Sequence, residues 1–73
     1  VVREFTEFIP IRYAKKNIFF PLKKTRNTLE VAITNPELSQ PLDDLARHFK
    51  CHIQSVISHK QAVLDLINRA YDE

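Results

Sequence analysis

Two apolar runs that flank a short polar turn constrain the fold of this chain more than any other feature. Residues 18–22 read Ile-Phe-Phe-Pro-Leu, and residues 29–34 read Leu-Glu-Val-Ala-Ile-Thr. A polar stretch of Lys, Thr, Arg and Asn separates them, and an Asn-Pro pair ends the second run. Apolar runs joined by a polar turn are typical of a β-hairpin. We therefore expect strands over 18–23 and 29–34.

A helical pattern precedes the hairpin, and another follows it. Pro10 fits the first position of a helix, where its missing N–H costs nothing, and predicts a helix over 10–16. After the hairpin, apolar residues recur at the i, i+3, i+4 and i+7 spacing of one helical face, which predicts a helix over 41–49. These residues are Leu42, Leu45, Ala46 and Phe49.

The last third of the chain reads as a strand followed by a helix. Residues 52–57 are expected to form the third strand. Ser58 and Gln61 have the spacing of a capping box, which predicts that the final helix begins at Ser58. Its inward face would contain Val63, Leu66, Ile67, Ala70 and Tyr71.

The expected order is therefore α-β-β-α-β-α, an α+β fold with helices packed on one face of a three-stranded antiparallel sheet. The strand order 2-1-3 follows most simply from a right-handed crossover, and 1-2-3 is the second choice. Seventy-three residues make a single small domain. We expect a globular core over 10–73, with residues 1–9 as a possible arm or linker. The chain begins without Met, so we expect it to be a fragment of a longer protein.

The sequence contains no glycine and one cysteine, and both counts exclude function classes. Phosphate-binding loops and dinucleotide fingerprints need glycine for close backbone approach, so neither is expected. Without glycine, Asn27 is the expected left-handed turn residue. A single Cys51 cannot form an internal disulfide, which suits a reducing compartment. No apolar run approaches the length of a membrane helix.

Four residues could suggest a metal or thiol site, namely His48, Cys51, His52 and His59. Zinc needs four ligands in tetrahedral geometry, and the strand between His52 and His59 would hold those two about 20 Å apart. Adjacent strand residues point to opposite faces, so Cys51 and His52 make a poor catalytic pair. We expect no metal site, no cofactor and no catalytic residue. Asp43 and Asp44 suit the positive end of a helix.

The segment from 12 to 26 holds six basic residues and no acidic one. Aromatic residues lie among the positive charges, a pattern that occurs in nucleic-acid binding proteins. A solvated hairpin tip, an acidic protein partner and an anionic membrane surface remain open as alternatives. The candidate partner-binding residues are Arg12, Lys15, Lys16, Lys23, Lys24 and Arg26.

The chain resembles the amino-terminal domain of the type II secretion and type IV pilus assembly ATPases. In that family a proline-initiated helix with Ala leads to a strand containing Pro-Leu, as Pro10, Ala14 and Pro21-Leu22 do here. The family signature Leu-x-Val-Ala-Met-x-Asp-Pro stands at 29–36 as Leu-Glu-Val-Ala-Ile-Thr-Asn-Pro. A Leu-rich helix, a short strand and a helix ending near a Tyr follow in both. The resemblance covers about residues 9–72.

Three departures limit what the resemblance implies. Ile33 and Asn35 replace the Met and Asp of the signature, and Lys50 stands near the position of a family glycine. The glycine-containing cyclic di-GMP site of some members has no counterpart here. The resemblance implies a non-enzymatic docking domain that joins a cytoplasmic ATPase to an inner-membrane assembly protein, peripheral to that membrane. A sensor of a nucleotide second messenger such as cyclic di-GMP is the alternative, and a nucleic-acid-binding module ranks third.

Overall fold

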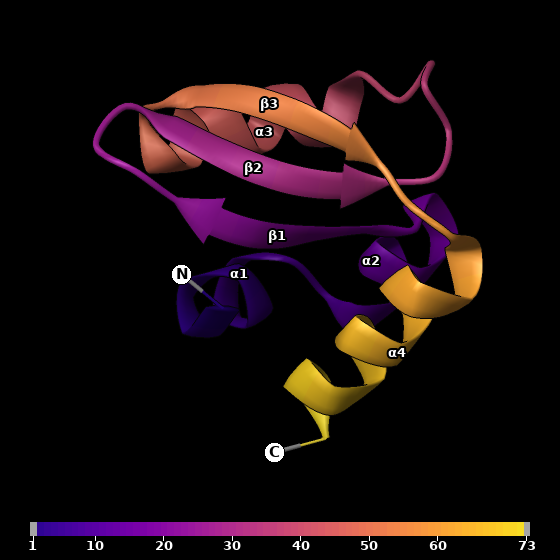
Figure 1. Ribbon diagram of the computed structural model, residues 1–73. Coiled ribbons are helices and arrows are strands. Elements are labelled where there is room, and N and C mark those ends of the chain that lie inside the picture. The colour runs from indigo at the N-terminus through magenta and orange to yellow at the C-terminus, as the bar shows by residue number, and fades with distance from the viewer. Residues whose placement is uncertain (1, 73) are drawn as a thin grey trace.

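The computed structural model describes residues 2–72 and shows four helices around a three-stranded sheet (Figure 1). The α+β class expected from the sequence is confirmed, with an additional helix at the amino-terminal end. In chain order the elements are α1 (Val2–Phe8), α2 (Ile11–Asn17), β1 (Phe19–Lys24), β2 (Thr28–Ile33), α3 (Gln40–Phe49), β3 (His52–Ile57) and α4 (Lys60–Tyr71).

The sheet is mixed, and its strand order is β1-β2-β3. β1 pairs with β2 antiparallel, whereas β3 pairs with β2 parallel. The expectation of a purely antiparallel sheet was therefore wrong, and the second-choice order 1-2-3 holds in place of 2-1-3. The reason is the connection over residues 34–51, which contains α3. A connection of a dozen or more residues that includes a helix can return the chain to the start of its neighbour and add a parallel strand.

One apolar core joins the sheet to the helices. α3 packs against β3, and α4 packs against β1 and β2. Leu29, Val31 and Ile33 of β2 are buried, as the alternation of that strand predicted, and Ala32 on its other face is buried as well. Burial of this apolar surface is the main source of stability in so small a domain. The buried core consists of Phe5, Ile9, Ala14, Phe19, Phe20, Leu29, Val31, Ala32, Ile33, Leu45, Val63 and Ile67.

One side chain of α1, Phe5, packs at the outer edge of β1. The ring of Phe5 lies 5.5 Å from Phe19 and 5.3 Å from Phe20, both edge-to-face. Adjacent strand residues leave a strand on opposite faces, so a ring that contacts both must lie beside the strand edge. Figure 1 shows α1 below the end of β1 that leads into the hairpin turn. The segment expected as a possible arm or linker thus contributes a buried phenylalanine beside one edge of the sheet.

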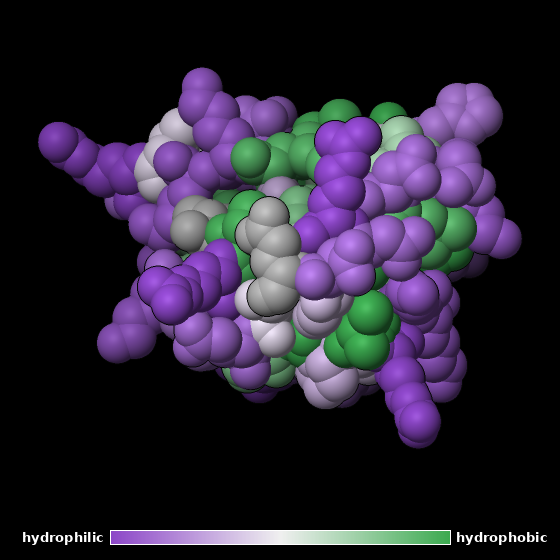
Figure 2. All heavy atoms as spheres, turned by 90° about the horizontal axis from the view of Figure 1, so that it is seen from below, coloured by the Kyte–Doolittle hydropathy of each residue, from purple (hydrophilic) through white to green (hydrophobic). Residues whose placement is uncertain are grey.

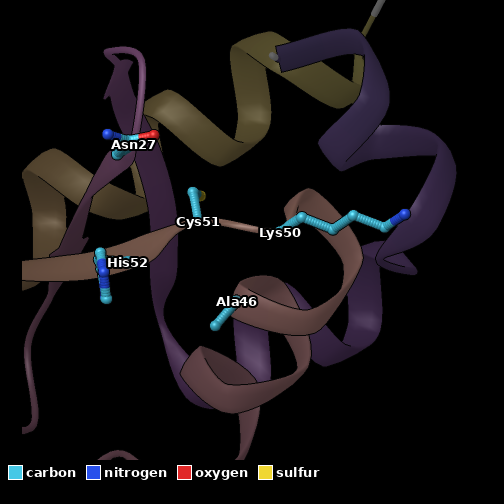
Figure 3. A pocket seen from close by; sticks show the side chains of 5 residues that line it. All are labelled: Asn27, Ala46, Lys50, Cys51 and His52. Atoms are coloured by element: carbon cyan, nitrogen blue, oxygen red, sulfur yellow. The ribbon is translucent and has the colours of Figure 1, made fainter.

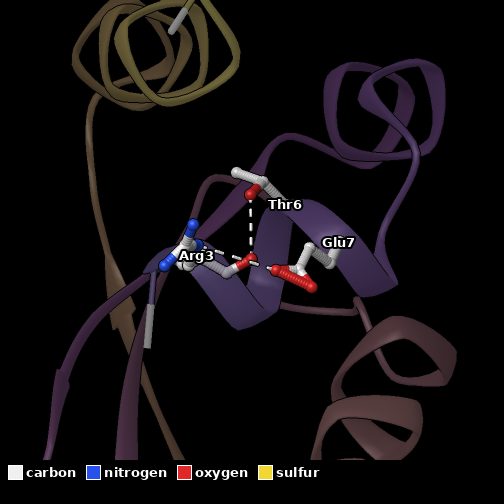
Figure 4. Close-up of polar contacts among 3 residues, drawn as sticks. All are labelled: Arg3, Thr6 and Glu7. Carbon is white, nitrogen blue, oxygen red and sulfur yellow. Dashed lines mark hydrogen bonds and ion pairs between the residues drawn. The ribbon is translucent and has the colours of Figure 1, made fainter.

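The outward side of α1 carries the exposed polar residues Arg3 and Glu7. Thr6 Oγ1 donates a 2.9 Å hydrogen bond to the Arg3 carbonyl, and Arg3 lies 3.8 Å from a Glu7 carboxylate oxygen (Figure 4). Such an exposed i,i+4 pair contributes only about 0.3–0.5 kcal/mol.

Figure 2 views the molecule from below and shows long polar side chains around scattered apolar atoms. This mixed face contrasts with the dry interior that Phe5 enters.

α2 and α3 each end at a residue in the left-handed conformation, and neither of these residues is glycine. Ile18 follows α2 at φ 53°, and Lys50 follows α3 at φ 54°. The Ile18 N–H donates to the carbonyl of Ala14, and the Lys50 N–H donates to the carbonyl of Ala46, in each case four positions earlier. A left-handed L-residue costs roughly 1–2 kcal/mol relative to the right-handed conformation. The prediction that Asn27 takes this conformation was wrong, since among residues 2–72 only Ile18 and Lys50 do.

The start of α4 also differs from the expectation. The helix begins at Lys60 after His59, and the Ser58 hydroxyl donates instead to the Val56 carbonyl at 3.3 Å. Gln61 donates to an Asp65 carboxylate oxygen at 3.0 Å. The predicted capping box therefore does not form, because Ser58 still belongs to the chain leaving β3.

Candidate functional site

The six basic residues proposed as a partner surface are all exposed, but the structure separates them into two groups. Arg12, Lys15 and Lys16 lie on α2, before β1 begins. Lys23, Lys24 and Arg26 lie at the other end of β1 and in the turn that follows. A six-residue strand spans about 16 Å between its first and last residues. We call these the helix group and the hairpin group.

The hairpin group is held by a closed turn. The Thr25 N–H donates a 2.8 Å hydrogen bond to the Thr28 carbonyl, and its hydroxyl reaches the same oxygen at 3.2 Å. Lys23 lies opposite Glu30 in the antiparallel ladder, so one cation of this group has a cross-strand carboxylate neighbour. The turn thus presents Lys23, Lys24 and Arg26 to solvent, with Glu30 across the ladder from Lys23.

The helix group has a local electrostatic explanation. Lys15 and Lys16 lie in the last turn of α2, where positive charge offsets the negative end of the helix dipole. Lys15 also lines a groove of ≈ 470 Å³ between α2 and α4, together with Ile11, Asn68, Arg69, Tyr71 and Asp72. Stabilisation of α2 therefore accounts for part of this charge without any partner.

Burial of the aromatic residues removes the main support for nucleic-acid binding. The stacking hypothesis needs exposed rings between the basic side chains. Phe19 is 0% exposed and Phe20 is 4% exposed. Tyr13 is half-buried and meets Phe19 edge-to-face at 5.9 Å. Burial raises the pKa of the Tyr13 phenol, and the Asp44 carboxylate nearby raises it further.

The structure spreads the residues considered for a metal or thiol site. His48 stacks on Phe8 with ring centres 4.0 Å apart. His52 is exposed at the start of β3, and His59 is exposed directly before α4. Cys51 is a half-buried free thiol. Over residues 2–72, no three His, Cys, Asp or Glu side chains gather closely enough to hold a metal ion.

The two aspartates of α3 differ in their surroundings. Asp44 accepts a 2.8 Å hydrogen bond from an Arg47 guanidinium nitrogen, which is also an i,i+3 ion pair. Asp43 lies in the first turn of α3, is exposed, and belongs to neither ion pair of the described part of the chain. Asp43 thus lies in the first turn of α3 as expected, whereas Asp44 lies just beyond that turn.

Two adjoining hollows between α3 and β3 were not predicted from the sequence. One, of ≈ 350 Å³, is lined by residues from the hairpin turn, the helix and the strand (Figure 3). The other, of ≈ 380 Å³, extends along the helix toward Ser39 and Asp43. Both share Ala46, Cys51 and His52, so they form one groove, which we call the α3–β3 groove. Figure 3 shows the Lys50 side chain extending away from the other labelled side chains.

The fold defines a class of protein: a small α+β module whose sheet has an open edge at β3. Comparison with family models gives the particular family: the chain matches the MshEN domain over residues 1–73. The chain therefore belongs to the MshEN domain family, an N-terminal domain of type II secretion and type IV pilus ATPases. The resemblance read from the sequence motifs is confirmed. No individual curated protein matches the chain.

Family membership places the chain in a part of these ATPases that is not the catalytic part. Within residues 2–72, none of the helices has both the length and the apolar character needed to cross a membrane.

Proposed function

We propose that this domain docks a secretion or pilus-type ATPase to a cytoplasmic segment of an inner-membrane assembly protein. The observation that carries the proposal is the match to an N-terminal, non-catalytic ATPase domain along the whole chain. A domain that lacks the motor's chemistry but is joined to it contributes by binding. In this proposal the parent protein is cytoplasmic and is held at the inner membrane through its partner.

The basic groups suit this role as steering charges. All six side chains are exposed, and the two ion pairs within residues 2–72 include none of them. Peripheral charges of this kind mainly raise association rates toward a partner of opposite charge. The proposed partner segment therefore carries acidic residues where it approaches α2 or the hairpin turn.

Titration calorimetry tests this role directly. The chain is titrated with purified cytoplasmic segments of inner-membrane assembly proteins from the same secretion or pilus system. In parallel it is titrated with ATP, with cyclic di-GMP and with a duplex oligonucleotide. We expect saturable binding of one protein segment and no heat from either nucleotide. Binding of cyclic di-GMP alone would replace docking by the sensing role, and binding of a duplex oligonucleotide would favour the nucleic-acid role.

A further inference from the structure

The outer edge of β3 is open. β3 is the last strand in the order β1-β2-β3 and pairs with β2 through all six of its residues. Over residues 2–72, no strand pairs with its other side. At the opposite edge of the sheet, Phe5 of α1 packs beside β1, so the two edges differ. His52, Gln54, Ser55 and Ile57 are exposed, and Ile57 reaches 61% exposure.

The backbone hydrogen bonds show which groups face the open side. The His52 N–H donates to the Asn27 carbonyl at 2.8 Å, and the Ser58 N–H donates to the Ile33 carbonyl at 2.7 Å. Alternate residues of a strand direct their N–H and C=O groups to opposite edges. The open edge therefore presents the N–H and C=O groups of Ile53, Ser55 and Ile57.

Nothing in the sequence of β3 discourages pairing. Exposed edges are usually protected by charged residues, by proline or by a covering element. β3 reads His-Ile-Gln-Ser-Val-Ile and contains no proline and no Asp, Glu, Lys or Arg. Its branched apolar residues also favour the extended conformation. The edge thus keeps its full capacity to add a strand.

The α3–β3 groove lies beside this edge and supplies side-chain pockets. Leu42 and Ala46 line it from the helix, and Ile53 and Ser55 line it from the strand. In an added strand, every second side chain points toward the helix side of the sheet. Main-chain bonds to an edge combined with pockets for alternate side chains are the basis of strand-addition recognition.

We propose that β3 and the α3–β3 groove bind an extended segment of a partner protein as a fourth strand. The segment carries apolar side chains at alternate positions and a Lys or Arg beside Asp43. This inference rests on the proposed docking function and names its surface and the kind of segment bound.

Charge complementarity favours this occupant over a second copy of the chain. Asp43 is an exposed carboxylate in the groove, and neither ion pair of the described residues involves it. A second β3 would bring no Lys or Arg to meet it, because the strand contains neither. A partner segment with one basic residue satisfies both the edge and the carboxylate.

Replacing a residue whose N–H faces the open edge by proline tests strand addition most directly. Ser55→Pro removes one N–H that faces the open side and leaves the bonds to β2 in place, a situation that edge strands tolerate. Ser55→Thr is the matched control, since it keeps the N–H and favours the strand. The probe is the cytoplasmic segment that binds the unmodified chain in calorimetry. We expect Ser55→Pro to weaken its Kd about tenfold or more, and Ser55→Thr to leave it within about twofold.

Charge reversal and amide exchange complete the test. Asp43→Lys should weaken binding about tenfold, whereas Asp65→Lys on the exposed side of α4 should not. In the unmodified chain, binding should slow exchange of the Ile53, Ser55 and Ile57 amides, while those of Gln54 and Val56 are already protected by β2. The exchange pattern does not depend on how a variant folds.

The outcomes separate this inference from the docking proposal. Unchanged affinity of Ser55→Pro, or no slowing at the three outward amides, overturns strand addition while docking stands. No binding of any segment by the unmodified chain overturns docking, and strand addition with it. Sedimentation that shows a dimer lost in Ser55→Pro would identify a second copy as the occupant and overturn the partner segment.

Discussion

The hydroxyl of Tyr71 donates a 2.6 Å hydrogen bond to the carbonyl oxygen of Ile9, 62 positions away in the sequence. Tyr71 is the last residue of α4, and Ile9 lies between α1 and α2. The Tyr71 ring also meets Phe5 edge-to-face at 6.4 Å. This pair therefore fastens the last helix to the two helices at the start of the chain.

Removing this hydroxyl should weaken the domain measurably. Tyr71→Phe keeps the ring against Phe5 and leaves the Ile9 carbonyl without its donor. We expect a loss of about 1 kcal/mol in the free energy of unfolding. Urea denaturation followed by circular dichroism measures it. An unchanged midpoint would mean that water replaces the hydroxyl and that ring packing alone joins the helices.

The same residue should make stability depend on alkaline pH. Burial raises the pKa of the Tyr71 phenol above its ordinary value of about 10. Above about pH 10, Tyr71 loses its phenol proton in the unfolded chain but keeps it in the folded protein. The free energy of unfolding therefore decreases as the pH rises toward the higher pKa that Tyr71 has in the folded protein. Stability from this residue is fully present below about pH 10 and falls above it. Urea midpoints between pH 8 and 11 should decline less steeply in Tyr71→Phe than in the unmodified chain.

Neighbouring residues on α4 provide a matched test of the core. Ile67 is 0% exposed, whereas Leu66 is only half-buried. Ile67→Ala should cost about 2–5 kcal/mol because it opens a cavity between α4 and the sheet, and Leu66→Ala should cost less. Denaturant midpoints of the two variants give the comparison. Equal costs would contradict the helix orientation described above.

Lys50 offers a stabilising substitution. Its left-handed backbone conformation costs conformational free energy that glycine, which has no Cβ, avoids. Its side chain extends away from the groove. Lys50→Gly should raise the free energy of unfolding by about 1 kcal/mol. Lys50→Ala, which keeps the left-handed penalty, is the control. A loss of stability in the glycine variant would show that the lysine makes a compensating contact.

Local pattern predicted the individual elements better than their arrangement. The alternation in β2 and the i, i+3, i+4 spacing in α3 depend on neighbours in sequence, and both elements form within two residues of the expected bounds. The parallel pairing of β2 with β3 depends on where α3 returns the chain. No local signal carries that information, so the sheet was wrongly expected to be antiparallel.

The candidate site shows the same division between local and spatial information. The sequence identified the basic residues of 12–26, but a linear segment does not reveal that β1 holds the helix group and the hairpin group apart. Phe5 of α1 packs on both Phe19 and Phe20, a role that the mixed sequence of 1–9 did not indicate. The α3–β3 groove arises from two elements that only the fold brings together.

The hairpin group provides a kinetic test of electrostatic steering. Changing both Lys24 and Arg26 to Glu should slow association with the partner segment far more than it alters folding, because peripheral charges act mainly on the on-rate. The effect should shrink as salt shortens the screening length to about 8 Å. Stopped-flow association over a salt series measures it, with Lys15→Glu and Lys16→Glu together as the helix-group comparison. Identical rates at low salt would assign the charges to solvation alone.

Deleting this domain from its parent ATPase tests the docking proposal most directly. Membrane fractions and ATP hydrolysis are measured side by side for the complete protein and for a version without residues 1–73. The docking proposal predicts that the shortened protein still hydrolyses ATP in solution but no longer sediments with inner membranes that contain the assembly protein. Undiminished membrane association of a shortened, active ATPase would contradict it.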